Sequence, residues 1–369
     1  MDLNEKKKLL IVDDSAFMRK LISDFFKDDT QITVIGTARN GKDALQKIKS
    51  LKPDVVTMDV EMPELNGIEA LKRIMEDYPI PIVMLSSTTK TGTENTMLAM
   101  EYGAVDFVAK PSGTISLDLH KIKDELVTKI TQAAQVSVIK IKKTAIPREV
   151  QKVQVEKTVP IPINKTIGKT VEREWLSTRK KVVVLGTSTG GPRALQEVLS
   201  GLPKNIKSPI LIVQHMPAGF TKSLATRLDQ LSEIHVKEAE QGDILHDGIA
   251  YIAPGGYHME ILQVGSNYVI DLDNLKAPRA GHRPSVDVMF ESVSQLNALD
   301  KVAVIMTGMG SDGTKGLIQL KQHGQVKAIT ESAETCIVYG MPKAAYESNL
   351  VDDVADVNDI AKTIMKYLH

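Results

Sequence analysis

The stretch KVVVLGTSTGGPRAL, residues 181–195, combines a strand, a glycine turn and the start of a helix. Its apolar, β-branched beginning is typical of a buried strand in a parallel sheet. Pro192 is favoured in the first turn of a helix, and apolar residues follow it at helical spacing. A hydroxyl in the turn, such as that of Ser188, would lie beside a helix N-terminus, where backbone N–H groups favour negative charge. The stretch therefore predicts an α/β domain with a candidate reactive serine.

The glycine turn has other interpretations. Glycines between a strand and a helix often do no more than allow close packing. The turn is not a phosphate-binding P-loop, because no Gly-Lys-Ser/Thr follows it. It is not a dinucleotide-binding GxGxxG motif either, because its glycines fall at positions 186, 190 and 191. Whether this turn serves only close packing or also a reaction has to be inferred from residues elsewhere in the chain.

The composition is that of a globular protein of two or three domains. The chain has 369 residues, of which 42% are hydrophobic and 25% charged. Its 46 basic and 46 acidic residues give no net charge, which argues against a general nucleic-acid binder. Cys336 is the only cysteine, so no internal disulfide is expected. No stretch has the character of a signal peptide or a membrane span, and we expect a cytoplasmic protein that is not membrane-inserted.

The first 134 residues alternate short apolar runs with helical patterns. Strands are expected at residues 9–12, 32–38, 54–59, 82–85 and 105–109. This alternation predicts a parallel sheet with right-handed crossovers. In such a sheet, functional residues gather at the carboxyl ends of the strands.

Five polar side chains reach that edge: Asp13, Asp14, Asp59, Ser86 and Lys110. Three carboxylates at one edge repel each other unless a cation joins them, and oxygen ligands of this kind suit Mg²⁺. A central aspartate beside a cation, a lysine and a hydroxyl can accept a phosphoryl group. Helix capping would account for Asp14 alone but not for the whole set.

The motifs that carry these residues resemble those of the receiver domain of two-component response regulators, over roughly residues 1–125. They are LLIVDD at 9–14, MDVEMPELNG at 58–67, SS at 86–87 and KP at 110–111. The resemblance implies a flavodoxin-like fold and phosphorylation of Asp59 by a histidine kinase. It implies that Mg²⁺ is held by Asp14, Asp59 and the backbone carbonyl of Glu61, with Asp13 nearby. Ser86 and Lys110 would sense the phosphoryl group.

Residues 126–178 finish a helix and then lose helical periodicity. The segment is rich in Lys, Val, Thr and Pro and lacks glycine turns, which predicts an extended interdomain linker. A β-hairpin or a basic docking strip is the alternative. Trp175, the only tryptophan, is expected to anchor the end of the linker on the next domain.

Residues 179–369 form a second alternating unit, for which we expect a doubly wound, mostly parallel α/β domain. Its strands are expected at residues 181–185, 209–213, 249–253, 301–306 and 326–329. A helix with leucines at spacings of three and four is expected from Phe220 to Leu231. No basic recognition helix is visible, which argues against the DNA-binding output domain of a transcription factor.

Ser188, His215 and Asp312 each follow one of these strands, so they arrive at one edge of the predicted sheet. A serine needs a base to take its proton, and the base needs a carboxylate to fix its tautomer.

The residues alone leave alternatives open for these three roles. His246, His258 and His282 compete for the role of base, and Asp312 could be a simple turn former. Cys336 is better explained as a small buried hydrophobe than as a nucleophile.

Six ordered motifs resemble the catalytic domain of the chemotaxis protein-glutamate methylesterase family. They are GTSTGGP at 186–192, QHMP at 214–217, APGGYHM at 253–259, RPSVDVMF at 283–290, MTGMGSDG at 306–313 and VYGMPKAA at 338–345. The resemblance implies Ser188 as nucleophile, His215 as general base and Asp312 as its orienter. It implies that the backbone N–H of Met309 contributes to the oxyanion hole, and that no cofactor serves this domain.

The two resemblances together imply a phosphorylation-activated serine hydrolase of bacterial chemotaxis. Its substrates would be glutamyl methyl esters and glutamines on chemoreceptor helices, and a chemotaxis histidine kinase would be its phosphodonor. Nucleic acid is not expected as a partner. Two other functions keep the same residues in different roles. One is a receiver-controlled amidase or esterase acting on another substrate, and the other is a phospho-regulated docking protein without activity.

Overall fold

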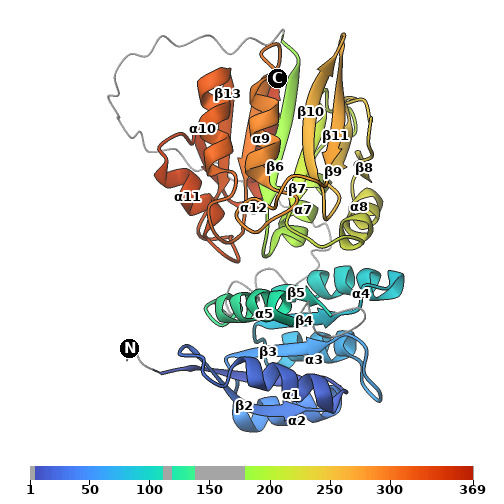
Figure 1. Ribbon diagram of the computed structural model, residues 1–369, viewed down its shortest axis with the longest axis vertical. Coiled ribbons are helices and arrows are strands. Elements are labelled where there is room, and N and C mark those ends of the chain that lie inside the picture. The colour runs from blue at the N-terminus through green and yellow to red at the C-terminus, as the bar shows by residue number, and fades with distance from the viewer. Residues whose placement is uncertain (1–4, 111–118, 138–178, 369) are drawn as a thin grey trace, which may run out of the picture.

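A computed structural model describes residues 5–110, 119–137 and 179–368. These residues form two α/β units, stacked along the long axis of the molecule (Figure 1). Most of the predicted linker, from residue 138 onward, lies outside the described residues, as does Trp175. Among the described helices, none is both long and apolar enough to cross a lipid bilayer.

The N-terminal unit is a five-stranded parallel sheet in the order β2-β1-β3-β4-β5, with helices on both faces. Its strands are β1 (Lys7–Val12), β2 (Ile32–Ala38), β3 (Val55–Asp59), β4 (Ile82–Ser86) and β5 (Asp106–Ala109). Its helices are α1 (Ala16–Phe25), α2 (Gly41–Leu51), α3 (Gly67–Asp77), α4 (Lys90–Glu101) and α5 (Leu119–Ala133). The predicted parallel sheet is confirmed. Because β1 pairs with both β2 and β3, the chain changes direction across the sheet at the carboxyl ends of β1 and β3.

Four helices of this unit begin at a polar cap that the sequence supplies. Ser15, Asn40, Asn66 and Thr89 each accept a hydrogen bond from a backbone N–H group in the first turn of the helix that follows. These caps fix where each helix starts. They therefore also fix the short loops that carry the acidic residues at the sheet edge.

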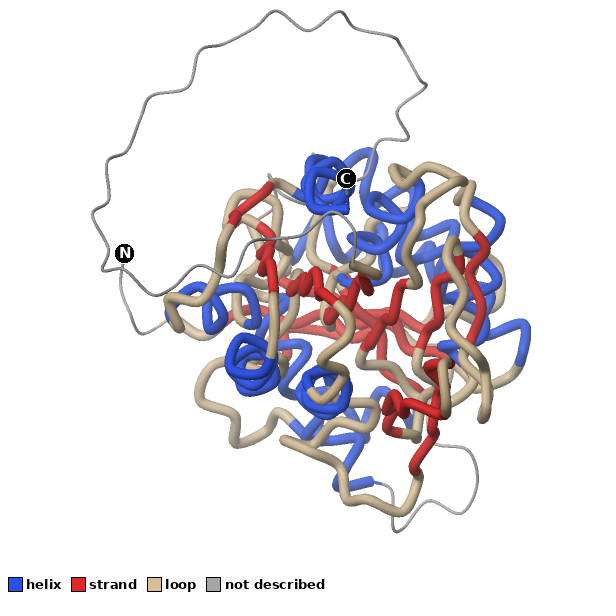
Figure 2. Tube along the Cα trace, turned by 90° about the horizontal axis from the view of Figure 1, so that it is seen from above, coloured by secondary structure: helices blue, strands red, loops and turns tan. Residues whose placement is uncertain are grey.

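The C-terminal unit is a seven-stranded, all-parallel sheet in the order β14-β13-β12-β6-β7-β9-β8. Its strands are β6 (Lys181–Thr187), β7 (Ile210–Gln214), β8 (His235–Glu238), β9 (Ile249–Ile252), β12 (Asp300–Ile305), β13 (Val326–Glu331) and β14 (Asp353–Ala355). Its helices are α7 (Gly191–Ser200), α8 (Phe220–Leu231), α9 (Val286–Ser294), α10 (Thr314–His323), α11 (Met341–Glu347) and α12 (Val357–Leu368). Figure 2 shows strands in red between helices in blue. The doubly wound architecture is confirmed.

Four strands of this unit are absent from the sequence prediction. β8 and β14 are short edge strands of four and three residues, and charged residues interrupt their apolar pattern. The strands β10 (His258–Val264) and β11 (Asn267–Asp273) form a separate antiparallel hairpin. Only one face of this hairpin is apolar, with Met259, Ile261 and Ile270 buried. A ribbon with only one apolar face has neither helical spacing nor the continuous apolar run of a buried parallel strand, so the sequence prediction missed these two strands.

Strand β6 occupies the centre of the second sheet, between β12 and β7. All residues of β6 are buried. The glycine turn after β6 is therefore flanked by the loops after β7 and β12. This order places the three candidate catalytic residues at adjacent positions along the sheet edge.

The two units contact each other through α4 of the first and α8 and α7 of the second. Phe107 of β5 stacks on Phe220 at the start of α8, with ring centroids 4.6 Å apart. At the edge of the contact, Arg227 of α8 is ion-paired with Glu101 of α4, and its Nη2 donates to Glu101 Oε2 at 2.8 Å. The carboxyl edge of the second sheet therefore faces the N-terminal unit (Figure 1).

Candidate active site and phosphoacceptor site

The turn that carries Ser188 is held by its neighbours on both sides. The Ser188 N–H donates to the carbonyl of Thr307, in the loop after β12, over 3.0 Å. The Ser188 carbonyl accepts from the side-chain amide of Gln214, at the end of β7, over 2.9 Å. A Cβ atom on Gly308 would lie 2.7 Å from Ser188 Cβ, so glycine is required there. The backbone of the candidate nucleophile is thus fixed by both flanking strands.

Helix α7 begins directly after this turn and has no side-chain cap. Its N-cap residue is Gly190, whose φ of 78° lies in the left-handed region that favours glycine. No acidic residue lies in the first turn of the helix. Backbone N–H groups at this end of α7 are therefore suited to stabilising a negative charge that develops beside Ser188.

The buried carboxylate of Asp312 accepts hydrogen bonds from several donors. His215 Nε2 lies 2.8 Å from Oδ2, and the Val286 N–H also donates to Oδ2 at 2.7 Å. The Ser285 hydroxyl and the Asp287 N–H both donate to Oδ1 at 2.9 Å. Burial acts to raise the pKa of Asp312, but His215 and the backbone donors outweigh it and hold the pKa at about 2. Asp312 is therefore ionised at neutral pH.

The charge of Asp312 determines which nitrogen of His215 carries the proton. An ionised carboxylate can only accept hydrogen bonds, so Nε2 must be the donor. Nδ1 of the neutral ring is then the nitrogen with a free lone pair. Nδ1 is buried and, within the described part of the chain, has no hydrogen-bond partner. His215 thus presents its free lone pair from Nδ1, as a general base requires.

The structure brings His215 and Asp312 together but does not join Ser188 to His215. No hydrogen bond between described residues reaches Nδ1, so the serine hydroxyl does not donate to it here. Such bonds are often long without substrate and tighten when the substrate binds. The roles of these three residues remain predictions, now supported by the Asp312–His215 contact.

The other candidates for base and nucleophile lie in different surroundings. His246 is on an exposed loop, and His258 is fully buried with Nε2 3.1 Å from the carbonyl of Ala277. His282 has no carboxylate partner among the described residues, but its ring stacks on that of His215. Cys336 is fully buried, as a structural cysteine would be. His215 is thus the candidate base with a buried carboxylate to orient it.

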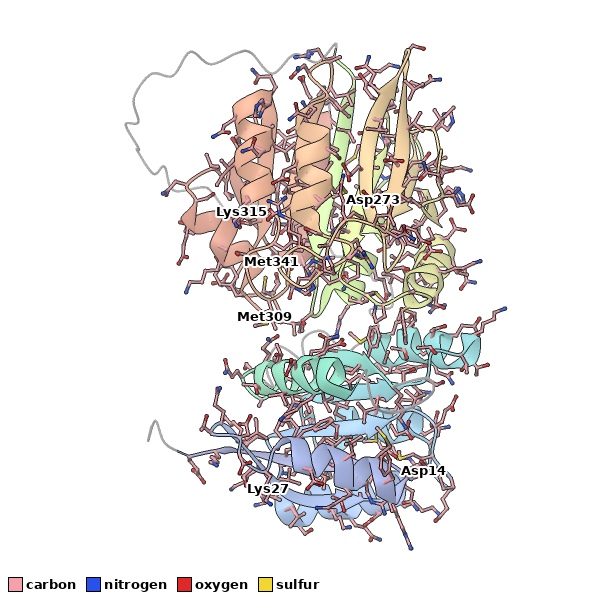
Figure 3. All side chains as sticks on the ribbon, viewed as in Figure 1. Asp14, Lys27, Asp273, Met309, Lys315 and Met341 are labelled. Atoms are coloured by element: carbon pink, nitrogen blue, oxygen red, sulfur yellow. The ribbon has the colours of Figure 1, made fainter. Side chains whose placement is uncertain are left out.

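Met309, the candidate oxyanion residue, lies in the loop after β12. Its side chain is 45% exposed, although it is apolar. Figure 3 shows Met309 at the end of the C-terminal unit that faces the N-terminal unit. There its sulfur accepts a hydrogen bond from Gln132 of α5. The part of the backbone proposed to hold the oxyanion therefore lies at the boundary between the two units.

The second predicted site, in the N-terminal unit, has the expected cluster of charges. Carboxylate oxygens of Asp13, Asp14 and Asp59 lie within 4.8 Å of one another. The Lys110 ammonium lies 2.7 Å from Asp59 Oδ2 and 3.0 Å from Asp13 Oδ2. Burial raises the pKa of Asp59 to about 6, with Lys110 opposing the rise and Asp13 adding to it. This set of hard oxygen donors fits Mg²⁺.

Ser86 and Glu61, two further residues predicted for this site, differ in their contacts with Asp59. The Ser86 hydroxyl donates to the carbonyl of Gly92 at 3.0 Å and accepts from the Thr96 hydroxyl at 2.6 Å. It is therefore bonded to the first turns of α4 and not to Asp59. Glu61 contacts Asp59 through its N–H, which donates to Oδ1 at 3.2 Å.

Comparisons with known proteins agree with both units. The family described as CheB methylesterase matches residues 183–364, and the response regulator receiver domain matches residues 9–120. A protein of Halalkalibacterium halodurans is 54% identical over 99% of each chain. A protein of Bacillus subtilis is 50% identical over 97% of each chain. Both are named protein-glutamate methylesterase/protein-glutamine glutaminase.

The chain belongs to the CheB methylesterase family. The solved structure of the Thermotoga maritima CheB methylesterase catalytic domain is 43% identical to it. That match covers 51% of this chain and 98% of the solved one, with a TM-score of 0.49. The relatives that match over 97% and 99% of this chain confirm the family resemblance stated from the sequence motifs.

The receiver of this CheB-family protein contacts the residue next to the candidate nucleophile. The Thr189 hydroxyl donates to Asp106 Oδ2, at the start of β5, over 2.5 Å. Lys129 of α5 lies 3.2 Å from Asp106 Oδ1, and both Asp106 and Thr189 are buried. Sequence reasoning missed this contact. The signal in the sequence was Asp106, a charged residue at the start of an apolar strand. Such residues are too common to indicate a contact between domains.

The lowered pKa of Asp312 predicts a defined dependence of stability on pH. A carboxylate with a depressed pKa contributes stability above its unfolded pKa of 3.8 and loses that contribution as the pH falls toward 2. The shift corresponds to about 2 kcal/mol in the free energy of unfolding. Between pH 5 and pH 2, the free energy of unfolding of the wild type, measured with urea, should therefore fall by about 2 kcal/mol more than that of Asp312→Asn. Equal decreases in the free energy of unfolding of the two proteins would show that Asp312 is not held ionised by its donors.

Proposed function

We propose that Ser188, His215 and Asp312 carry out the protein-glutamate methylesterase and protein-glutamine glutaminase activity of this CheB-family protein. The observation that supports this most directly is the hydrogen bond between His215 and the buried carboxylate of Asp312, beside the turn that carries Ser188. An ionised carboxylate, an oriented imidazole and a serine at a helix N-terminus are the parts that acyl transfer requires.

The reaction would proceed through an acyl-enzyme. Nδ1 of His215 takes the proton of the Ser188 hydroxyl as its oxygen attacks the ester carbonyl. Backbone donors at the start of α7 and the N–H of Met309 would stabilise the oxyanion, each contributing roughly 10²–10³ in rate. His215 then protonates the departing methoxide, and methanol leaves. A water molecule, deprotonated by His215, hydrolyses the acyl-enzyme and leaves glutamate on the substrate.

The substrates we propose are glutamyl methyl esters and glutamines on the signalling helices of chemoreceptors. These helices lie in the cytoplasm, where the enzyme would meet them. A chemotaxis histidine kinase would phosphorylate Asp59. Asp13, Asp14 and Asp59, with the backbone carbonyl of Glu61, would hold Mg²⁺, which when bound offsets the negative charge of the phosphoryl group.

We propose that the unphosphorylated receiver restrains the active site through its contacts with the catalytic domain. Asp106 binds the hydroxyl of Thr189, next to Ser188, and Gln132 binds the side chain of Met309. Phosphorylation would draw the Ser86 hydroxyl toward Asp59 and away from its partners in α4. Since α4 contacts α8 and α7, this change would weaken the interface and open the site.

Ser188→Ala should lose nearly all turnover while the protein stays folded, because triad members act as a unit. Methanol release from methylated receptor fragments, with acetyl phosphate as phosphodonor, measures this. Cys336→Ser is the matched control and should stay active. Loss of activity in Cys336→Ser but not in Ser188→Ala would move the nucleophile to the cysteine, and a docking protein without activity would release no methanol in any variant.

Asp59→Asn should keep basal methanol release but no longer respond to acetyl phosphate, because the phosphoacceptor oxygen is gone. Its initial rates with and without the phosphodonor should be equal, whereas the wild type is activated. Full activation of Asp59→Asn would contradict the proposed phosphorylation site.

Arg227→Glu should raise methanol release in the absence of a phosphodonor, because it places a negative charge opposite Glu101 at the edge of the interface. The matched control is the charge swap Arg227→Glu with Glu101→Arg, which restores an ion pair of opposite sense. The double variant should return toward the low wild-type rate. If both variants behave like the wild type, this edge of the interface does not restrain the enzyme.

A further inference from the structure

The ring of His282 lies face to face with that of His215. The two ring centroids are 3.7 Å apart and the ring planes differ by 7°. His215 thus has a hydrogen bond in its plane, to Asp312, and an aromatic ring against one face. A rotation of the His215 ring about its Cβ–Cγ bond would break both contacts.

The loop that carries His282 has a closed backbone of its own. Arg279 and His282 exchange two backbone hydrogen bonds, of 3.0 and 2.9 Å. Between them, Ala280 and Gly281 have positive φ angles of 50° and 84°. The Arg279 guanidinium is bound to Glu291 of α9, which ties this turn to a helix of the domain. His282 is therefore held at a defined position and does not lie on a free loop.

The same short segment also holds Asp312. Ser285 donates its hydroxyl to Oδ1, and Val286 donates its N–H to Oδ2. Within five residues the chain thus contacts the face of the base and binds the carboxylate that orients it. The segment that positions the His282 ring is thus also the segment that binds the carboxylate of Asp312.

The surroundings of His282 keep its ring neutral. Burial, followed by the positive charge that His215 can carry, lowers the pKa of His282 to about 4. Asp312 opposes this change, and Lys129 of the receiver adds to it. A neutral ring stacked on an imidazolium attracts it, whereas a second imidazolium would repel it. The stack is thus compatible with His215 carrying a proton during the reaction.

We propose that His282 is a positioning residue for the general base: its ring, stacked on His215, holds that imidazole with Nε2 on Asp312 and Nδ1 left for the serine. The contribution comes from the flat ring and not from its nitrogens. This inference rests on the proposed role of His215, since a stack on a residue without a catalytic role would not affect the rate.

The test compares His282→Phe, which keeps a flat ring, with His282→Ala, which removes it. The full-length protein with acetyl phosphate is assayed for methanol release from methylated receptor fragments. His282→Ala should lower kcat roughly 10- to 100-fold with little change in KM, because a misplaced base affects the reaction step and not substrate binding. His282→Phe should stay within about threefold of the wild type, since the ring contact that positions the base is kept. His246→Ala, an exposed histidine of the same domain, is the control and should have no effect.

A second measurement does not depend on the receptor substrate. A fluorophosphonate reagent reacts with an activated serine, whose oxygen displaces fluoride while the base takes the proton. The rate of labelling of Ser188, followed by mass spectrometry, should fall in His282→Ala by a factor similar to that in kcat and be retained in His282→Phe. Equal labelling of the wild type and His282→Ala would overturn the proposal.

Slow labelling of both His282 variants would also overturn it, because a ring nitrogen would then be required. If the fluorophosphonate labels Ser188 of the wild type but no methanol is released, the proposed substrate is wrong. The labelling rates of the variants still test the positioning role of His282. Thermal unfolding of each variant separates these outcomes from loss of the fold.

Discussion

The structure of the active site depends on one buried carboxylate, that of Asp312. An ionised group at this depth is costly unless it is hydrogen-bonded, and here His215, Ser285, Val286 and Asp287 all donate to it. The loop after β12, the loop after β7 and the start of α9 therefore meet at one point. Because Asp312 can only accept, it also sets the tautomer of His215 and so the nitrogen that can act as base.

The arrangement of strands accounts for how these groups meet. Parallel strands deliver their carboxyl ends to one edge, and β6 lies between β7 and β12. Ser188, His215 and Asp312 can thus be far apart in the chain and close in space. The receiver then covers the same edge through α4, β5 and α5. In Figure 3, Asp14 lies well away from Met309, so the proposed signal from the candidate phosphoacceptor site would have to cross the receiver to reach the candidate active site. Helix α4, which binds Ser86 on one side and α8 on the other, connects the two.

Features that depend on strand order could be predicted from the sequence, whereas features that depend on loops could not. The two parallel sheets, the acidic cluster and the positions of Ser188, His215 and Asp312 could be inferred because each residue lies at the end of an apolar strand or in the loop that follows it. The stack of His282 on His215 could not be inferred, because the turn that holds it has no periodic pattern. The contact of Thr189 with Asp106 joins residues 83 positions apart in two domains, and no local signal indicates it. The position of the Ser86 hydroxyl on α4 likewise depends on how the helix packs.

Ionised Asp312 fixes His215 with the proton on Nε2 and the lone pair on Nδ1. The most direct test is the ¹⁵N NMR spectrum of the His215 ring in the full-length protein at neutral pH, assigned by its loss in His215→Gln. We expect a protonated, pyrrole-type Nε2 and an unprotonated, pyridine-type Nδ1. A spectrum with the proton on Nδ1, or with rapid exchange between the two tautomers, would contradict it.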